Sequence, residues 1–460
     1  MKNQQQMLAT EPVGKLLLKY SVPAIIGMIV NALYNVVDRI FIGNIPGVGA
    51  LAITGVGVTM PIMTIILAFG MLIGIGSTAN ISIKLGQGKR DDAEIIIGNS
   101  ITLSVIIGLA ISIIGISFGD VILKSFGASE STLYYAKSYI YIVLGGSIFN
   151  LLAFSLNNTI RGDGNPKLAA TIMVVGCLTN IVLDAVLIFV FNMGIQGAAI
   201  ATVTSQAVTA IWGLTYYIKG KSNLKLKKSN LKLNKDIVKI IFSIGSAQFA
   251  MQIAASLVQI ISNNALKAYG GDLAIGAMAT ISSISMIFLM PVFGINQGSQ
   301  PIIGFNYGAK QYERANKAFK ISVSVACVIM TVGWLIIQIN PELIVGMFNK
   351  DPKLMDITTN GARLYLFMLP IVGISITGSN YMQSVGKAKS AMILGLLRQV
   401  ILLIPMIMIL PKFFGLNGVW YSQPTSDLLS TMITAVVLVK ELKRYKNIDK
   451  ELELQSELQG

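Results

Sequence analysis

The feature that most constrains this chain is a series of apolar runs, each about 20 residues long and separated from the next by a polar break. In lipid the backbone polar groups must be satisfied within the segment itself, so such runs cross a bilayer as helices. Composition agrees, since 53% of the residues are hydrophobic, 12% are charged and the mean hydropathy is +0.69. The sequence therefore predicts an all-α polytopic membrane protein with twelve spans, at residues 16–42, 50–82, 94–118, 134–160, 168–191, 196–218, 240–266, 273–304, 316–340, 361–385, 390–411 and 416–438.

The distribution of positive charge predicts the orientation. An even number of spans puts both termini on one side, and most of the 36 Lys and Arg residues fall there, most densely in segment 219–239. By the positive-inside rule that side is cytoplasmic, so we expect a multi-pass protein of the cell (plasma) membrane with both termini in the cytoplasm. The net charge of +15 is then a topology signal, with the lipid bilayer as partner and no nucleic acid. A monomer is expected.

The chain also repeats itself. Gly76 recurs as Gly298 and Lys167 as Lys389, in each case 222 residues later, and other matches keep the same offset. Two six-helix lobes related as parallel, pseudo-symmetric repeats suit alternating access, in which two bundles rock about a central site. We predict five regions: a cytoplasmic N-terminus (1–15), an N-lobe with spans one to six (16–218), a basic cytoplasmic linker (219–239), a C-lobe with spans seven to twelve (240–438) and a cytoplasmic tail (439–460).

Four oxygen-bearing side chains of the first lobe are the main site candidates. Asp184 lies in a strongly apolar segment with Asn180 one helical turn before it, and an acid inside a membrane span is a functional hypothesis by default. At about 1.5 Å per residue, Asp38 and Thr202 reach the same layer, near the outer surface. Two carboxylates, an amide and a hydroxyl suit a hard monovalent cation and equally a proton, and the sequence leaves both open.

Further residues could support this site. Tyr34 and Asn35 share a helix face with Asp38, and Pro23 could kink the same span. The alternative is that Asp38 ends its helix near the headgroups and that Asp184 is hydrogen-bonded in the core. Aromatic, thioether and amide side chains that could line a substrate cavity are Phe154, Met286, Met290 and Gln252.

Other intramembrane chemistry is limited. Arg398 and Asp427 lie close enough in depth for an ion pair, which we interpret as structural. The chain has no histidine, which excludes imidazole relays and histidine metal sites, and no Walker loop, zinc-ligand spacing or nucleophile motif. We therefore expect no enzyme activity, no catalytic residues, no cofactor and no metal beyond a possible Na+ at the four candidate ligands.

A set of short motifs in the first half of the chain carries a resemblance that extends over nearly all 460 residues. They are Tyr20-Ser-Val-Pro23, Asp38-Arg-Ile-Phe-Ile-Gly43, Lys84-Leu-Gly86, Arg161-Gly-Asp-Gly164-Asn-Pro-Lys167, Asn180 with Leu183-Asp184, and Gly194-Ile-Gln-Gly197-Ala-Ala. Together, in two six-span halves, they make the chain resemble the multidrug and toxic compound extrusion (MATE) family of secondary transporters.

The resemblance implies a drug-resistance antiporter that exports organic, often cationic, compounds in exchange for Na+ or H+. It also implies that Asp38, Asn180, Asp184 and Thr202 are the ligands of the coupling ion. Other members carry acids in the second lobe, but spans seven, eight and ten have none here, so coupling is placed on the first lobe. Two rivals remain: a lipid-linked saccharide flippase of the same superfamily, which would need a strongly cationic cavity, and a membrane scaffold or receptor that transports nothing.

Overall fold

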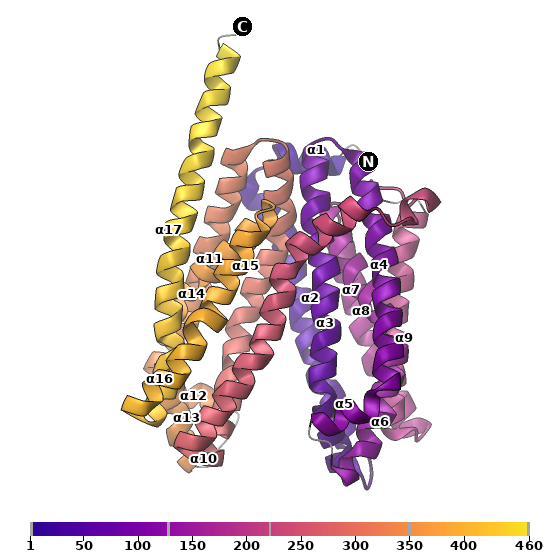
Figure 1. The fold of residues 1–460 in the computed structure, drawn as a ribbon, viewed down its shortest axis with the longest axis vertical. Coiled ribbons are helices and arrows are strands. Elements are labelled where there is room, and N and C mark those ends of the chain that lie inside the picture. Colours follow the sequence, from indigo (N-terminus) through magenta and orange to yellow (C-terminus); the bar gives the residue numbers. More distant parts are fainter. Residues whose placement is uncertain (1–2, 127–128, 220–221, 348–351, 458–460) are drawn as a thin grey trace. The chain divides into compact units, whose positions relative to one another are not determined.

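The computed structural model describes residues 3–126, 129–219, 222–347 and 352–457, and within these ranges it contains helices and no strand (Figure 1). Parts of the predicted N-terminus, linker and tail, at residues 1–2, 220–221 and 458–460, lie outside the described residues. The helices of the first half are α1 (Asn3–Thr10), α2 (Val13–Gly43), α3 (Gly49–Gly86), α4 (Arg90–Ser117), α5 (Gly119–Ser125), α6 (Glu130–Gly145), α7 (Ser147–Gly162), α8 (Pro166–Ala185), the π-helix η1 (Val186–Val190) and α9 (Gly194–Ile218).

The second half has the same plan. After the short 3₁₀-helix η2 (Lys228–Leu231) come α10 (Lys235–Gly308), which is broken at Gly271, α11 (Tyr312–Ile339), α12 (Pro341–Val345), α13 (Pro352–Tyr365), α14 (Leu369–Ser384), α15 (Ala388–Leu396), the π-helix η3 (Leu397–Leu403), α16 (Ile404–Phe414) and α17 (Leu416–Glu457).

Each of the twelve predicted spans falls on helix: 240–266 and 273–304 are the two parts of α10, 390–411 runs through α15, η3 and α16, and the others lie on one helix or on two consecutive helices. By length and composition, nine helices of the described chain can cross a membrane, and two bent pairs, α6 with α7 and α13 with α14, each make one more span. The twelfth predicted span, 416–438, is the first part of α17, whose buried serines, Gln423 and Asp427 make it less apolar. Large apolar side chains such as Ile113, Ile211 and Val328 are more than half exposed, as expected where lipid covers the protein.

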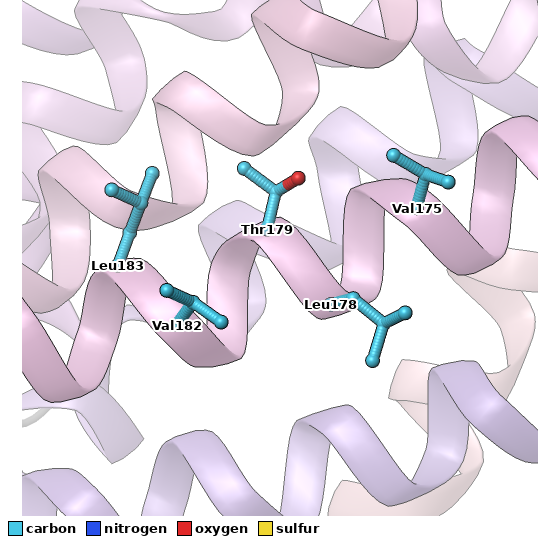
Figure 2. Close-up of a pocket in the computed structure, with 5 residues that line it drawn as sticks. All are labelled: Val175, Leu178, Thr179, Val182 and Leu183. Carbon is cyan, nitrogen blue, oxygen red and sulfur yellow. The ribbon is translucent and has the colours of Figure 1, made fainter.

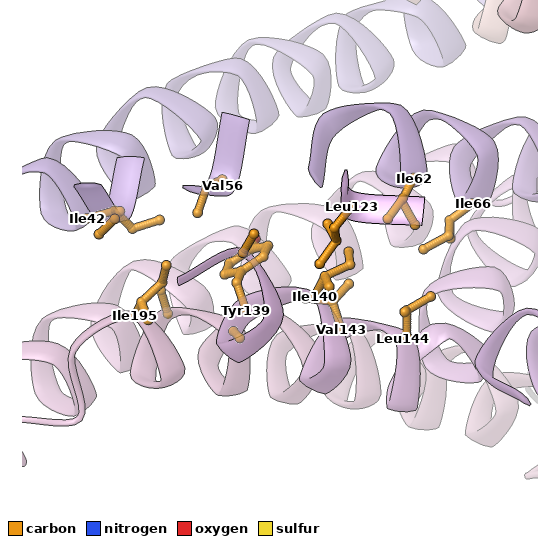
Figure 3. Close-up of a cluster of buried hydrophobic side chains, with 14 of the residues drawn as sticks. Ile42, Val56, Ile62, Ile66, Leu123, Tyr139, Ile140, Val143, Leu144 and Ile195 are labelled. Carbon is orange, nitrogen blue, oxygen red and sulfur yellow. The ribbon is translucent and has the colours of Figure 1, made fainter. Parts of the chain in front are cut away.

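The chain forms two compact units whose borders fall inside helices. Unit 1 contains residues 26–249 with the start of the chain, and unit 2 contains residues 10–25 and 250–460. Consequently α2 starts in unit 2 and ends in unit 1, whereas α10 starts in unit 1 and continues in unit 2. Each unit has its own apolar core. In unit 1, Figure 3 shows Tyr139 among Ile42, Val56 and Ile195.

The backbone reproduces the repeat seen in the sequence. Gly164 and Gly386, 222 residues apart, both have positive φ. Gly194 and Gly415, 221 residues apart, also both have positive φ. Both bent pairs, α6 with α7 and α13 with α14, turn by 55°. The two halves therefore share turns and bends as well as residues.

Gly76 and Gly298, which the repeat pairs, each lie where another helix packs closely against them. A Cβ on Gly76 of α3 would overlap the Ile241 carbonyl oxygen at the start of α10, within unit 1. A Cβ on Gly298 would lie 2.6 Å from the Ser21 Cα of α2, within unit 2. Only glycine allows such close helix packing, which is typical of membrane bundles.

The linker between the halves is held against unit 1. Asn99 of α4 accepts a hydrogen bond from the Asn234 backbone N–H at 2.8 Å, and the Glu94 carboxylate lies 2.8 Å from the Lys227 Nζ. Nearby, the buried Asp163 accepts hydrogen bonds from the Tyr216 hydroxyl at 2.6 Å and the Asn223 backbone N–H at 3.1 Å. These contacts fix where α10 begins.

Candidate functional site

Asp184 lies at the end of α8, where the helix changes its winding. Asn165 caps the start of α8 by accepting from the Leu168 backbone N–H, and the helix runs to Ala185, where the π-helix η1 follows at once. A π-helical turn widens the backbone and is frequent at functional sites. Asp184 is completely buried at this change of winding.

Asp38 meets Asp184 from a different helix. It lies in the second half of α2, is 9% exposed, and its carboxyl group hydrogen-bonds with that of Asp184. Two carboxyl groups can share a hydrogen bond only if one of them holds a proton, since two carboxylates would only repel. Among the residues that the structure describes, neither Oδ1 atom of this pair has a hydrogen-bond partner. The pair therefore offers buried acceptor oxygens to a proton or a metal cation.

Asn180 and Thr202 complete this group, as the sequence predicted from depth. With its amide oriented so that both ends are satisfied, Asn180 donates to the Asp184 Oδ2 at 2.9 Å and accepts from the Thr202 backbone N–H at 3.3 Å. In the other orientation its Nδ2 lies 3.5 Å from the Thr202 Oγ1. Both residues are nearly fully buried. The four candidate ligands thus form one contiguous cluster from α2, α8 and α9.

Tyr139 of α6 is a neighbour of the site that the sequence reading did not single out. Its hydroxyl is hydrogen-bonded to Thr202, and it interacts electrostatically with both Asp38 and Asp184. Its ring is packed in the core of unit 1 (Figure 3). Nothing in the sequence distinguishes it from the other 14 tyrosines, because a tyrosine in an apolar span usually packs in the core or lies at the interface.

The predicted supporting residues differ in their placement. Tyr34 lies near the acids and interacts with Asp38, Asp184 and Tyr139. Asn35 is exposed and donates to the Asn31 carbonyl oxygen at 2.7 Å. Pro23 lies inside α2, about 22 Å along the helix axis from Asp38.

The predicted cavity residues belong to different units. Phe154 of α7 lies in unit 1, where its ring packs against Gly70 and Gly74 of α3. Gln252, Met286 and Met290 lie on α10 in unit 2, and the Met286 side chain is half exposed. A substrate cavity lined by these residues therefore stays a prediction.

A separate apolar hollow lies along α8. Its volume is about 350 Å³, and Figure 2 shows that all of its labelled residues come from this one helix: Val175, Leu178, Thr179, Val182 and Leu183. None of them is titratable, and Val182 is 60% exposed. The hollow thus presents an apolar surface, while Asp184 and Asn180 of the same helix are buried.

The site chemistry suits a small monovalent cation or a proton. Two buried carboxylates without a counter-charge are strongly disfavoured in a water-poor interior, whereas one bound cation or proton removes part of that penalty. The basic residue next in sequence, Arg39, interacts electrostatically with Asp38, but its side chain is exposed and is not buried with the pair. Carboxylate, amide and hydroxyl oxygens are the donors that hard cations prefer. The cluster can therefore exist in an occupied and an empty state of different charge.

Comparisons with known proteins agree with the repeat and the fold. The MatE family model matches residues 23–186 and again residues 248–409. The multidrug export protein MepA of Staphylococcus haemolyticus is 26% identical over 451 residues, 98% of each chain, and MepA of Staphylococcus aureus strain MRSA252 is 26% identical over 438 residues, 95% of this chain and 96% of that one.

Solved structures show the same fold. A MOP superfamily transporter from Pyrococcus furiosus superposes with a TM-score of 0.90 at 23% identity, covering 96% of this chain and 99% of that one. A MATE structure in a bent conformation superposes with a TM-score of 0.91 at 23% identity, covering 97% and 99%. Both cover the two halves of this chain.

Proposed function

This chain belongs to the MatE family of multidrug export transporters, and from this premise we propose that it exports cationic organic compounds in exchange for Na+ or H+ by alternating access. Membership of this family shows that the chain is a membrane transporter for small molecules. The coupling ion and the charge of the substrate are our proposal.

The observation that carries the proposal is the contact between Asp38 and Asp184. Both acids are buried, they hydrogen-bond with each other, and each keeps an Oδ1 atom with no hydrogen-bond partner in the described part of the protein. A purely structural pair of acids would gain nothing from this arrangement, because mutual repulsion and burial both oppose it. An exchangeable cation or proton accounts for both acids at once.

The connection of α2 to both units supports the coupling step. Asp38 lies on the part of α2 that belongs to unit 1, whereas residues 13–25 of the same helix belong to unit 2. Ion binding at Asp38 therefore acts on a helix that continues directly into the other unit. Occupancy shifts the balance between conformations to the extent that the ion binds one of them more tightly. Pro23, inside α2, is where we propose that the helix bends.

The substrate class follows from the relatives and from charge. The relatives named MepA are multidrug export proteins. We propose organic cations as substrates. A positively charged substrate would repel the cation or proton bound at the acids and so favour its release. Phe154, Met286, Met290 and Gln252 are proposed to contact the substrate. We further propose a monomer in the plasma membrane with both termini cytoplasmic, no cofactor and no catalytic activity.

The experiment is ethidium efflux from proteoliposomes with a sodium gradient and a pH gradient imposed separately. The proposal predicts efflux that follows one of these gradients and stops when Asp38 and Asp184 are both changed to Asn. Efflux that ignores both gradients would contradict it. Transfer of a lipid-linked saccharide without ethidium efflux would favour the flippase, and a protein that moves neither would favour the scaffold or receptor.

A further inference from the structure

A second buried charged group lies in unit 2, outside the site described above. The Arg398 Nε is 2.6 Å from the Asp427 Oδ1, and Asp427 is 4% exposed. Gln423 donates from its Nε2 to the same Oδ1 at 3.0 Å, and the Tyr365 hydroxyl is hydrogen-bonded to the Gln423 Oε1, also at 3.0 Å. Ser426 donates to the Arg398 carbonyl oxygen at 2.6 Å. The predicted ion pair is thus present and is embedded in a polar network.

The internal repeat relates this network to the ion site of unit 1. Residues up to Ala169 correspond to residues 222 positions later, one residue is lost between Ala169 and Gly194, and from the Gly194 and Gly415 pair onward the offset is 221. By this rule Thr202 corresponds to Gln423, the centre of the network. At an offset of 222, the partners of Asp38, Asn180 and Asp184 are apolar: Ile260, Leu402 and Met406.

The two networks use equivalent spans. In unit 1 the polar groups come from spans four, five and six, at Tyr139, Asn180 with Asp184, and Thr202, with Asp38 added from α2. In unit 2 they come from spans ten, eleven and twelve, at Tyr365, Arg398, and Gln423 with Asp427. Each unit has a π-helix in its middle span, at positions that the repeat does not pair: η1 follows Asp184, whereas η3 contains Arg398.

The charge balance of the two networks differs. The unit 1 cluster has two acids and its neighbouring base, Arg39, is exposed, so it needs an external cation or proton. The unit 2 cluster has one acid, Asp427, and one guanidinium, that of Arg398, which form an ion pair. In unit 2 the guanidinium of Arg398, a side chain of the protein itself, therefore supplies the cation.

We propose that Arg398 is a built-in counter-cation that does for Asp427 in unit 2 what the coupling ion does for Asp38 and Asp184 in unit 1. This inference rests on the proposed function. It assigns ion exchange to Asp38 and Asp184 alone, and it holds that Arg398 prevents unit 2 from exchanging ions. Its corollary is that Asp427 becomes a second exchangeable cation site, for Na+ or H+, once the guanidinium is removed. Loss of a merely structural ion pair would also leave the buried Asp427 to take up a proton and keep it. A second exchange site also binds Na+ in place of that proton, so Na+ binding is the result that separates the two.

The test counts the ions bound by purified protein, with radioactive sodium and with proton uptake in weakly buffered solution. Arg398→Gln is expected to bind one Na+ more than the wild type, and adding Asp427→Asn should remove that extra Na+. Arg398→Lys, which keeps the charge, should bind the same number as the wild type. An unchanged Na+ count in Arg398→Gln, or an increased count in Arg398→Lys, would overturn the proposal.

The double variant Arg398→Gln with Asp427→Asn is the control for folding. It leaves no uncompensated buried charge, so it should fold even where a single change does not, because an unpaired buried charge is strongly destabilising. It should keep the wild-type ion count and gradient-driven ethidium efflux. Loss of the wild-type ion from this folded double variant would show that the pair takes part in exchange, contrary to the proposal.

A last variant separates this inference from the proposed function. Asp38→Asn with Asp184→Asn removes the unit 1 site, and adding Arg398→Gln should restore binding of one cation, now at Asp427. If the first two changes leave gradient-driven efflux intact, the proposed function fails. If they abolish efflux but the added Arg398→Gln restores no cation binding, the proposed function stands and the role of Arg398 is refuted.

Discussion

The carboxyl group of Asp38 hydrogen-bonds with that of Asp184, although the two residues lie on α2 and α8, the first and the fifth span of the chain. A shared hydrogen bond between two acids requires a proton, and the same oxygens can hold Na+ when the proton leaves. This contact is the reason why we propose that the first unit responds to ion occupancy.

Asp184→Asn and Asp38→Asn are each expected to abolish gradient-driven ethidium efflux, because an amide cannot exchange the charge that couples ion to substrate. Efflux is measured in proteoliposomes at matched protein content. Asp120→Asn is the matched control, since Asp120 of α5 is an exposed acid paired with Lys137 of α6. Equal loss in the control, or full efflux in either site variant, would refute the role of the pair.

Thr202→Val is expected to weaken coupling-ion binding by about tenfold, since it keeps the side-chain shape but removes a hydroxyl from a charged site, a loss of about 1.4 kcal/mol. The measured quantity is the ion concentration that gives half-maximal efflux. Thr209→Val on the same helix is the control, because its hydroxyl donates to the Gln206 carbonyl oxygen, away from the acids. The prediction fails if both valine variants shift this concentration alike.

Gly76→Ala is expected to destabilise the protein by about 1–3 kcal/mol, because the added methyl group would overlap the Ile241 carbonyl oxygen and backbone must shift. Gly57→Ala on the same helix α3 is the control, since a Cβ there meets nothing within 4 Å. Melting of the purified proteins in detergent measures the difference. A melting temperature equal to that of the control would show that the two helices do not pack this closely.

Asp163 is expected to make stability depend on pH. Burial raises the pKa of this loop carboxyl from 3.8 to about 7, although hydrogen bonds from Tyr216 and Asn223 and the charge of Arg90 act in the opposite direction. Because the folded protein holds the proton more tightly than the unfolded chain, stability is highest at low pH and falls as pH rises from about 4 to about 7. The upper limit of the loss is about 4 kcal/mol.

Asp163→Asn removes this titration while keeping acceptors for the same donors. The melting temperature of the variant minus that of the wild type should therefore increase between about pH 4 and about pH 7 and then stay constant. A difference that is independent of pH, or that shrinks as pH rises, would contradict the assignment.

The sequence predicted the spans and the repeat because both depend on local chemistry. A run of about 20 apolar residues has few structures open to it in lipid, and a constant offset of 222 residues preserves turn glycines such as Gly164 and Gly386. The four site oxygens were predicted together because depth in a bilayer follows from position along a helix.

Other features depend on contacts that a sequence does not display. Tyr139 joins the site through a hydrogen bond with Thr202, yet its sequence context is that of any aromatic residue in a span. The bend between α6 and α7 occurs at Gly146, whereas the apolar run 134–160 reads as one straight helix. The division of α2 between two units is set by tertiary packing and leaves no mark in its composition.

The most direct test of the account is ion displacement by substrate in purified protein. Ethidium is added to protein equilibrated with radioactive sodium, or to protein in weakly buffered solution, and the released sodium or protons are measured. We predict release of one of these ions from the wild type and none from the variant with Asp38→Asn and Asp184→Asn. Ethidium binding that releases neither ion from the wild type, or equal release from the variant, would contradict it.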